Sequence, residues 1–336
     1  MKPSLNWAVI GTGGIATDFV QALQKSTRGT VVNVLGSSPA KARAFADRWG
    51  IERASESLEQ LASDSRVEAV YVASPHPAHE EQAIACLRAG KHVLCEKPLS
   101  VDAAKAERII NVARERRVFL MEAYMYRCHP LVRELIARLE QGAIGELRHL
   151  RADFGFRVER DPEHRLFSPK LGGGAILDVG GYTVSMARLI AGLVEKAPFA
   201  EPTRIDGNGY RGPAGADELA CLLLTFRSGF TAQLTCSVFH DVGTKAVIFG
   251  DKGKIELPDP WIPQGDRQSL STSFVIARYG ESEEVVRIDT DKATYAIEAE
   301  LVADTLPGLE PPWPAMNHED TLANLRVMDA WRARIE

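Results

Sequence analysis

The sequence predicts two domains of different class: an N-terminal α/β domain on a doubly wound parallel sheet, then an α+β domain with a large, mostly antiparallel sheet. A length of 336 residues exceeds one ordinary hydrophobic core. Short apolar runs alternate with helical patterns up to residue 123, which is typical of parallel βα units. From residue 124, apolar and polar residues alternate with a period of two, which favours antiparallel strands. We therefore expect domains at residues 1–123 and 124–316, with a last helix in residues 317–336.

The composition indicates a globular protein with a small-molecule partner. Hydrophobic residues make up 45% of the chain, charged residues make up 25%, and the formal net charge is -5. The charges are mixed along the sequence, so no basic tract predicts a nucleic-acid partner and no polybasic helix predicts a membrane surface. No run approaches the roughly 18 apolar residues of a membrane helix, and no signal-type run follows Met1. We therefore expect a cytoplasmic protein.

The cysteines argue against a disulfide framework and against a metal site. Their number is odd, and the sequence contains no C-x-x-C pair and no Cys/His cluster at zinc spacing. We expect reduced, mostly buried thiols and no bound metal. The five are Cys86, Cys95, Cys128, Cys221 and Cys236.

The first element is a short apolar strand at residues 7–10, which a glycine turn joins to a helix. The turn reads G-x-G-x-x-A, a pattern of dinucleotide-binding units, although a plain glycine turn is the alternative. Gly11 permits the tight turn, Gly13 lets the backbone approach a pyrophosphate, and Ala16 keeps helix and strand close. The helix N-terminus then offers N–H groups to the phosphates. The turn residues assigned to the cofactor are Gly11, Thr12, Gly13, Gly14 and Ile15.

The end of the second strand, expected at residues 31–35, indicates which dinucleotide is bound. An NAD site places Asp or Glu here to hold the ribose 2′-hydroxyl, and this sequence has neither. Ser37 and Ser38 can donate to a 2′-phosphate, which Lys41 can neutralise together with Arg43. We therefore expect NADP. NAD is the alternative if both basic residues are only the solvated face of the next helix.

A loop follows the strand expected at residues 67–73 and lies at the carboxyl edge of the sheet, where it borders the cofactor. Its histidines lack a third partner of metal-ligand type, so we interpret them as loop-packing residues beside the nicotinamide ribose. A helix at residues 80–89 and a strand at residues 92–95 come next. The loop residues assigned to cofactor binding are Ser74, Pro75, His76 and His79.

The tripeptide Glu96-Lys97-Pro98 ends the strand at residues 92–95. The proline fixes its own φ and restricts Lys97, so we interpret Lys97 as a positioned cation, with a surface lysine in a turn as the alternative. Glu96 either positions Lys97 or contacts the nicotinamide ribose, and the sequence does not decide between these roles. An amphipathic helix at residues 102–117 and a strand at residues 118–121 complete the first domain.

Alternating segments define the second domain after a helix at residues 131–139. Turns such as Arg227-Ser228-Gly229 separate them, as in antiparallel hairpins. The predicted strands are residues 147–156, 220–226, 231–238 and 245–249, and the predicted final helices are residues 293–306 and 318–335.

A glycine-rich break at residues 172–174 precedes a helix that carries Asp178 and Tyr182. The two residues are four apart, which places them on one face of the helix, one turn from each other. An aspartate among apolar neighbours is rare unless the side chain has a role in the protein interior. The alternative is that Tyr182 is a core aromatic residue and Asp178 an internal cap.

These motifs, in this order, resemble the Gfo/Idh/MocA family of NAD(P)-dependent sugar and diol oxidoreductases over essentially the full chain. Many members have histidine at the place of Tyr182, whereas the branch of glucose-fructose oxidoreductase, dihydrodiol dehydrogenase and NADP-dependent D-xylose dehydrogenase has tyrosine. That branch tends to carry arginine where this chain has Ser38. The motifs are Gly11 to Ala16, Glu96-Lys97-Pro98, Met121 to Arg127 with Pro130, and Gly172 to Tyr182.

The resemblance implies a Rossmann fold for the first domain and a last helix that packs back on it. It also implies an open face on the second sheet that is used for dimerisation, so we expect a homodimer or a higher homo-oligomer. The small-molecule partner would be a carbohydrate or a diol.

The expected chemistry removes a hydride from carbon and a proton from the attached hydroxyl, and the base must lie within hydrogen-bond reach of that hydroxyl. A tyrosine hydroxyl has a reference pKa of about 10, and a nearby cation favours the phenolate. We therefore predict Tyr182 as the acid/base, Lys97 as its electrostatic partner and a binder of the substrate hydroxyl, and Asp178 as the group that orients substrate or Lys97. Weaker substrate candidates are Arg127, Phe156 and Arg157.

The expected function is therefore NADP-dependent hydride transfer to or from a sugar, a cyclic polyol or a trans-dihydrodiol. A reductase of a dicarbonyl or keto sugar is a second enzymatic hypothesis, because these residues do not set the direction of the reaction. A non-catalytic regulator that binds dinucleotide and sugar is the alternative from another class; loss of the lysine would mark it, and Lys97 is present. An enzyme of the glucose-fructose type with permanently bound cofactor would be expected to carry a secretion signal and an N-terminal arm.

Overall fold

The computed structural model describes residues 4–161, 163–263 and 270–335, and it divides into two compact units. Unit 1 comprises Met1–Cys128 and Asp291–Thr321, and unit 2 comprises His129–Thr290 and Leu322–Glu336. This division differs from the expected boundaries, which assigned residues 291–316 to the second domain and the last helix to the first. Residues 1–3 and 336, the ends of the expected domains, lie outside the described residues.

Six parallel strands form the sheet of unit 1, and β1 lies at its centre between β2 and β4. This doubly wound order confirms the fold expected for the first half of the chain. Strands β1, β4 and β5 are almost fully buried, as strands covered on both faces are. In sheet order the strands are β3 (Arg53–Ser55), β2 (Gly29–Leu35), β1 (Leu5–Ile10), β4 (Ala69–Val72), β5 (His92–Glu96) and β6 (Leu120–Ala123).

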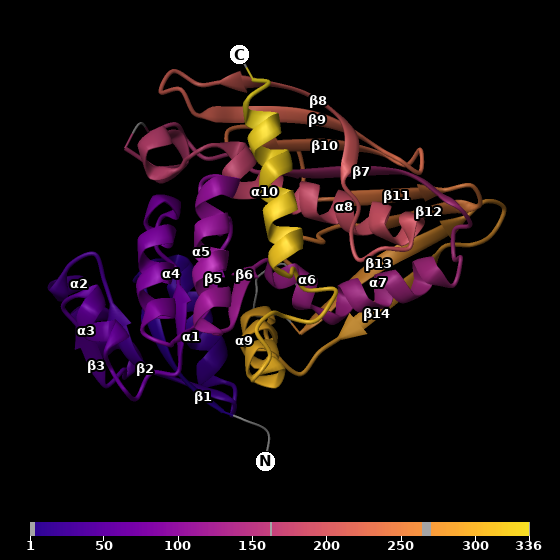
Figure 1. Ribbon diagram of the computed structural model, residues 1–336. Helices are drawn as coiled ribbons and strands as arrows, with labels where there is room; N and C mark the ends of the chain where they lie inside the picture. The colour runs from indigo at the N-terminus through magenta and orange to yellow at the C-terminus, as the bar shows by residue number, and fades with distance from the viewer. Residues whose placement is uncertain (1–3, 162, 264–269, 336) are drawn as a thin grey trace. The chain divides into compact units, whose positions relative to one another are not determined.

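Capping residues in the sequence mark the ends of helices in unit 1, as α5 shows. Asp102 accepts a hydrogen bond from the backbone N–H of Lys105 at 2.8 Å and so caps the start of α5, whose C-cap Arg117 has φ 54°. Helices α4 and α5 pack side by side (Figure 1). The helices are α1 (Gly14–Gln24), α2 (Pro39–Trp49), α3 (Leu58–Ala62), α4 (His79–Arg88), α5 (Ala103–Arg116), α6 (Met125–Cys128) and α9 (Thr294–Thr305).

Helix α9 belongs to unit 1 because it packs on α1 and α6 and is ion-paired to the loop before β2. Arg28 is largely buried and contacts Asp304 at 2.6 Å and Glu300 at 3.4 Å. Ser26 and Lys292 also contact Glu300, at 2.8 Å and 2.7 Å. These long-range contacts explain why the segment at residues 291–321 groups with the N-terminal half of the chain, which local sequence pattern does not show.

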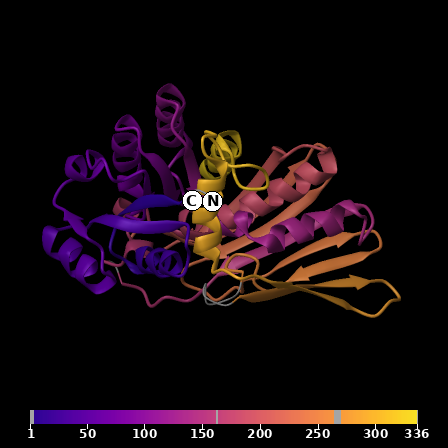
Figure 2. The same cartoon turned by 90° about the horizontal axis from the view of Figure 1, so that it is seen from below.

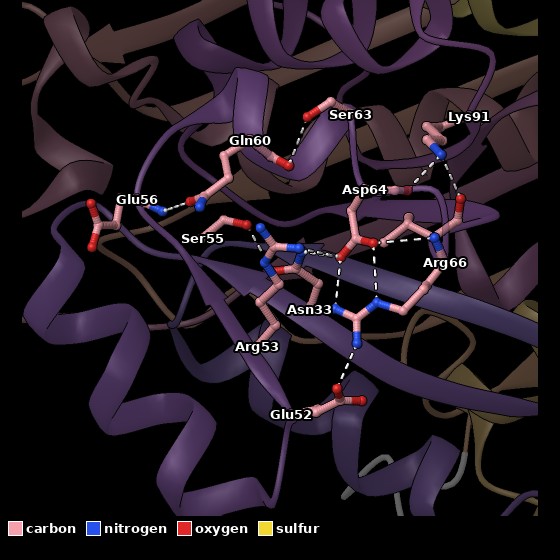
Figure 3. Close-up of polar contacts among 11 residues, drawn as sticks. Asn33, Glu52, Arg53, Ser55, Glu56, Gln60, Ser63, Asp64, Arg66 and Lys91 are labelled. Atoms are coloured by element: carbon pink, nitrogen blue, oxygen red, sulfur yellow. Dashed lines mark hydrogen bonds and ion pairs between the residues drawn. The ribbon is translucent and has the colours of Figure 1, made fainter.

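A polar network ties the outer strands of the first sheet to the loop after α3 (Figure 3). The side chain of Asp64 is buried and contacts Arg66 at 3.0 Å and Arg53 at 3.6 Å. Asn33 donates to Asp64 at 2.9 Å and accepts from Ser55 at 2.9 Å. The hydrogen bonds from Arg66 hold the pKa of the Asp64 carboxyl at about 2. This network fixes the short strand β3, which the sequence pattern did not predict.

Unit 2 contains an eight-stranded sheet in which only the β7–β10 pair is parallel among the described strands. This mostly antiparallel sheet confirms the predicted class. The sequence pattern found β7, β9, β10 and β11 and missed the other strands. In sheet order they are β14 (Glu284–Asp289), β13 (Ser271–Arg278), β12 (Gly253–Leu257), β11 (Ala246–Gly250), β7 (Leu147–Gly155), β10 (Thr231–Ser237), β9 (Asp217–Phe226) and β8 (Pro202–Arg211).

Helices α7 (Pro130–Glu140) and α8 (Gly181–Glu195) lie along one face of this sheet (Figure 2). On β9 the side chains of Leu222 and Leu224 are buried, whereas Leu223, which points to the other face, is 44% exposed. Four of the five cysteines in the chain are buried, and Cys221 of β9 is exposed. The sheet therefore has a covered face and an open face.

The last helix, α10 (His318–Arg332), has its first turn in unit 1 and the rest in unit 2. His318 Nε2 lies 3.1 Å from the carbonyl oxygen of Leu120 in unit 1. In unit 2, Trp331 is fully buried and donates from Nε1 to the carbonyl oxygen of Cys221 at 3.1 Å. Only the first turn of this helix therefore follows the expectation that it packs on the dinucleotide-binding domain.

One segment, Pro169–Glu195, is long and apolar enough to span a membrane, with a mean hydropathy of 1.2 over its best window. This finding differs from the sequence-based prediction that no run approaches the length of a membrane helix. In the structure 94% of that window is buried inside the protein, as in the core helix of a soluble protein. Its hydrophobicity is explained by burial against the sheet of unit 2.

Candidate functional site

The glycine turn after β1 has the geometry of a phosphate-binding turn. Gly11 has φ +115°, and an added Cβ there would lie 2.5 Å from the carbonyl oxygen of Ala73, so only glycine fits. At Gly13 and Gly14 an added Cβ would meet no described atom within 4 Å. The turn is therefore tight on the side of the sheet and open on the side that a ligand would approach.

Helix α1 starts at Gly14, and its N-cap, Gly13, offers no side chain to cap the first turn. The first turn of α1 thus receives no hydrogen bond from its N-cap residue, an arrangement that suits a phosphate. Thr12 and Ile15 are half-buried beside the turn. The residues present fit the pyrophosphate of a dinucleotide.

The turn after β2 carries the residues predicted to bind a 2′-phosphate. Ser38 is the N-cap of α2, and its Oγ accepts a hydrogen bond from the backbone N–H of Lys41 at 3.3 Å. Ser37, Lys41 and Arg43 are exposed. Because β2 is the neighbour of β1 in the sheet, this turn lies at the same edge as the glycine turn. The Ser38 hydroxyl serves the helix as a cap and can still donate its own hydrogen to a ligand.

The loop after β4 is held in place by its histidines. The ring of His79 is fully buried, with Nδ1 3.0 Å from the carbonyl oxygen of Pro98 and Nε2 2.9 Å from that of Ser74. Burial lowers the pKa of His79. His76 is also buried, and its ring packs edge-on against that of His79 at 5.7 Å. His79 thus joins this loop to the segment after Lys97.

Pro75 and Ser74 form the accessible part of the same loop. Pro75 is exposed and Ser74 is half-buried, with its Oγ donating to Gln82 Oε1 at 2.6 Å. These two residues are the ones from the loop that a cofactor at the sheet edge can reach.

Lys97 directly follows β5, at the carboxyl edge of the sheet, and its peptide bond to Pro98 is cis. Its side chain is half-buried, whereas Glu96 before it is only 8% exposed. Tyr71 of β4 donates to Glu96 Oε1 at 2.5 Å, and the backbone N–H of Lys97 donates to Glu96 Oε2 at 3.3 Å. Glu96 is therefore turned inward, which favours the role of positioning Lys97 over contact with a ribose.

A second buried carboxyl, Glu122, supports the chain just after Lys97. Its Oε1 accepts a hydrogen bond from the backbone N–H of Leu99 at 2.8 Å. Burial raises the pKa of Glu122 to about 7, although the Leu99 N–H and the charge of Lys97 act in the opposite direction. Two buried carboxyls on the neighbouring strands β5 and β6 thus hold the backbone on both sides of the Lys97–Pro98 bond: Glu96 bonds Lys97, and Glu122 bonds Leu99.

In unit 2, Asp178 lies in a π-helical turn, Ile176–Gly180, that leads into α8. The wider turn changes the simple one-turn spacing predicted for Asp178 and Tyr182, and such turns are frequent at functional sites. Asp178 is 5% exposed, and Arg165 donates from Nη1 to its Oδ1 at 2.9 Å. Gly174, with φ +119°, leaves room for Asp217, which accepts from the backbone N–H of Ile176 at 2.7 Å.

Tyr182 sits in an aromatic cluster at the start of α8. Its ring is 4% exposed and meets the rings of Phe154 at 5.3 Å and Trp261 at 6.3 Å, both nearly edge-on. Phe154 and Trp261 stack at 5.8 Å, and Trp261 donates from Nε1 to the carbonyl oxygen of Asp153 at 2.9 Å. This cluster fixes the ring of Tyr182 through strand β7 and the segment after β12.

The weaker substrate candidates have different surroundings. Arg127 is 1% exposed and donates to the Pro314 carbonyl oxygen at 2.6 Å and to Asp320 at 3.0 Å. A guanidinium held in this way serves the structure of unit 1, so we omit Arg127 from the proposed substrate contacts. Phe156 is half-buried and Arg157 exposed, and both follow β7 in unit 2.

The structure thus gathers the predicted residues into two groups, one in each unit. The cofactor candidates and Lys97 share the carboxyl edge of the first sheet, and Asp178 and Tyr182 share the entry to α8. Sequence reasoning missed Tyr71, Glu122 and Trp261 as supports of these groups. A buried tyrosine and a glutamate within apolar strands were the available signals for the first two.

Two family models match the sequence. The model of the oxidoreductase family with an NAD-binding Rossmann fold matches residues 5–124, and that of the GFO/IDH/MocA C-terminal domain matches residues 132–256. Among curated relatives, the trans-1,2-dihydrobenzene-1,2-diol dehydrogenase of Mus musculus is 36% identical over 262 residues, which are 77% of this chain and 76% of the relative. The enzyme of that name from Homo sapiens is 35% identical over 263 residues, with the same two coverages.

Solved structures give the same picture. The 3-ketoreductase KijD10 from Actinomadura kijaniata, in complex with NADP and TDP-benzene, superposes with a TM-score of 0.86 at 30% identity and covers 99% of this chain and 98% of that one. An aldose-aldose oxidoreductase from Caulobacter crescentus shares the fold, with a TM-score of 0.84 at 24% identity and coverages of 98% and 97%.

Proposed function

Because the chain belongs to the Gfo/Idh/MocA family of oxidoreductases, we propose that it is an NADP-dependent enzyme that moves a hydride to or from a carbinol carbon of a sugar, cyclic polyol or trans-dihydrodiol. The observation that carries this proposal lies in unit 1. Lys97 stands at the same sheet edge as the uncapped N-terminus of α1, so a cation is positioned beside a phosphate-binding turn. The nicotinamide, when bound, supplies the hydride acceptor or donor.

The protein supplies the proton chemistry. Tyr182 acts as the acid/base through its hydroxyl, and Lys97 lowers the cost of the phenolate by its positive charge and binds the substrate hydroxyl. Asp178, held by Arg165 at 2.9 Å, orients the substrate. The buried aromatic cluster around Tyr182 keeps its ring in one orientation, which favours proton transfer at a fixed site.

NADP is favoured by the turn after β2, where the exposed Ser37 and Lys41 present a donor and a cation and no carboxylate follows the strand. The complex of the related 3-ketoreductase with NADP supports the same choice. The substrate class is supported by the relatives, because the trans-1,2-dihydrobenzene-1,2-diol dehydrogenases are named for a diol.

Reduction of a keto sugar is the second candidate, and it is favoured by the 30% identity to a 3-ketoreductase over 99% of this chain. The same residues serve both directions, because Tyr182 gives its proton to a carbonyl oxygen in reduction and takes it from a hydroxyl in oxidation. The equilibrium of the reaction and the cellular ratio of the cofactors would decide between them.

A homodimer or a higher homo-oligomer in the cytoplasm remains our prediction for the assembly and its location. The open face of the second sheet supports a dimer, since Leu223 of β9 and Val285 of β14 are 44% and 66% exposed there.

The direct test is a screen of the purified protein with NADP and with NAD against aldoses, cyclic polyols and trans-dihydrodiols, with keto sugars and NADPH in the reverse direction. We expect reduction of NADP by at least one member of the first three groups. The matched control is Lys97→Met, which should bind NADP and show no turnover. Binding of dinucleotide without turnover of any substrate would instead favour a non-catalytic regulator.

A further inference from the structure

Glu298 on α9 is a fully buried carboxyl that the site described above does not use. It is 0% exposed, and neither of its oxygens has a hydrogen-bond partner among the residues that the structure describes. Ionisation of such a group in a low-dielectric interior is costly unless a hydrogen bond or a cation compensates it. The geometry therefore favours a carboxylic acid over a carboxylate at this position.

The groups that face Glu298 come from two strands and from its own helix. Glu96 of β5 is near enough for its charge to act on Glu298, and Tyr71 of β4 and Tyr295 of α9 belong to the same cluster. Tyr71 stacks on Phe19 of α1 at 4.0 Å, and α1 packs on α9. Two carboxyls and two phenols are thus enclosed together.

The neighbouring cations are engaged elsewhere. Arg28 and Lys292 contact Glu300 on the same helix, at 3.4 Å and 2.7 Å. Arg127 of α6, which also packs on α9, contacts Asp320 at 3.0 Å. The positive charges around α9 therefore act mainly on Glu300 and Asp320.

The two carboxyls of the cluster have unequal surroundings. Glu96 accepts hydrogen bonds from the Tyr71 hydroxyl and from the backbone N–H of Lys97, whereas Glu298 accepts none from the described residues. Two adjacent buried carboxylates repel each other, so one group takes the charge and the other keeps a proton. Burial, and then the charge of Glu96, raise the pKa of Glu298 well above its ordinary value.

We propose that Glu298 is a positioning residue for the Glu96–Lys97 turn: it remains a neutral carboxylic acid, so that Glu96 alone carries the negative charge next to Lys97. Ionisation of Glu298 at high pH then places a second negative charge beside Glu96 and loosens the turn that holds Lys97. The expected effect on dinucleotide binding rests on the proposed function. The protonation state of Glu298 does not depend on it.

The proton is tested by the pH dependence of unfolding in urea, followed by the fluorescence of buried tryptophans from pH 5 to 9. A pKa that is raised in the folded state gives a stability contribution that is complete below the unfolded pKa of about 4.5 and is lost as the pH rises toward the folded value. Relative to Glu298→Gln, the unfolding constant of the wild type should therefore rise by up to about tenfold per pH unit. If the ratio of the unfolding constants of wild type and Glu298→Gln stays constant with pH, the proposal is overturned.

Glu300→Gln is the matched control on the same helix. Because Glu300 contacts Arg28 and Lys292, this substitution should change stability by the same factor throughout that pH range. In a Glu96→Gln background the pH-dependent effect of Glu298→Gln should level off at a lower pH, because burial still raises the pKa of Glu298 but the charge of Glu96 is gone. A profile that levels off at the same pH in both backgrounds would show that Glu96 does not act on Glu298.

Two further measurements complete the test. The infrared difference spectrum between wild type and Glu298→Gln should show a carboxylic-acid C=O band at neutral pH, and carboxylate bands in its place would overturn the proposal. NADP should bind both proteins equally at pH 7, and only the wild type should lose affinity as the pH rises into the range where its unfolding profile levels off and Glu298 ionises. An equal pH dependence would refute the positioning role; failure of both proteins to bind any dinucleotide would refute the proposed function and leave the unfolding result standing.

Discussion

Arg165 donates to Asp178 at 2.9 Å, and this ion pair holds the carboxylate that the sequence places beside the predicted acid/base, Tyr182. The side chain of Asp178 is 6% exposed and that of Arg165 is 49% exposed. The carboxylate is therefore fixed from within unit 2, and its partner can be changed at the surface without opening the core.

Asp178→Asn should lower kcat/KM by roughly tenfold to a hundredfold, because a positioned carboxylate is replaced by an amide that orients the substrate less well. Arg165→Gln should cause a smaller loss in the same direction. The double variant should be no slower than Asp178→Asn, since both changes act through one interaction. Steady-state kinetics check this, with Arg227→Gln at a position where the side chain is 84% exposed as control, and losses that simply multiply would contradict it.

Lys41→Ala should raise the Kd for NADP about tenfold and leave the Kd for NAD unchanged, because only NADP carries the 2′-phosphate that Lys41 neutralises. Calorimetric titration with both dinucleotides measures this. Arg43→Ala, at another exposed position of α2, is the matched control and should have a smaller effect. An equal loss for both dinucleotides would show that Lys41 acts on another part of the cofactor.

Asp64→Asn should destabilise unit 1, because it removes the carboxylate that joins Arg66, Arg53 and Asn33 (Figure 3). The pKa of Asp64 is lowered to about 2, so its contribution is present above the unfolded pKa and is lost as the pH falls through about 2. The charge-dependent part of the expected loss at neutral pH is about 2.5 kcal/mol at most, given that one pKa unit corresponds to about 1.4 kcal/mol.

Urea unfolding of Asp64→Asn and wild type at pH 7 and at acid pH measures that difference. Glu56→Gln is a suitable control, since the Glu56 contact in the same region uses its backbone N–H. A difference that persists undiminished below pH 2 would show that the loss comes from packing and not from charge.

The first half of the fold was readable from the sequence because its signals are local. Gly11 needs a positive φ and a close approach to Ala73, and the strands next to it are continuous apolar runs. The same holds for Lys97, whose neighbours Glu96 and Pro98 are adjacent in sequence. When the role of a residue depends on its immediate neighbours in the chain, that role can be predicted without knowledge of the fold.

The missed elements depend on partners far away in the chain. Strand β8 has a mostly exposed and polar sequence, with Gly207 and Gly209 in contact with the last helix and with β9, so its hydrophobic pattern is weak. Helix α9 joins unit 1 through Arg28 and Asp304, which are separated by 276 residues. In the sequence, Glu298 resembles an ordinary helix residue, and its burial becomes visible only when α9 packs on α1 and α6. Such long-range burial is absent from any local pattern.

The most direct test of the proposed mechanism is the turnover of Tyr182→Phe with NADP and the best substrate found in the screen. The change removes one hydroxyl and keeps the ring that packs against Phe154 and Trp261, so the fold should be retained. Loss of an acid/base group predicts a fall in kcat of about 10²–10⁴-fold or more, with the Kd for NADP nearly unchanged. Retention of full activity by Tyr182→Phe would contradict the role of this tyrosine and with it the mechanism.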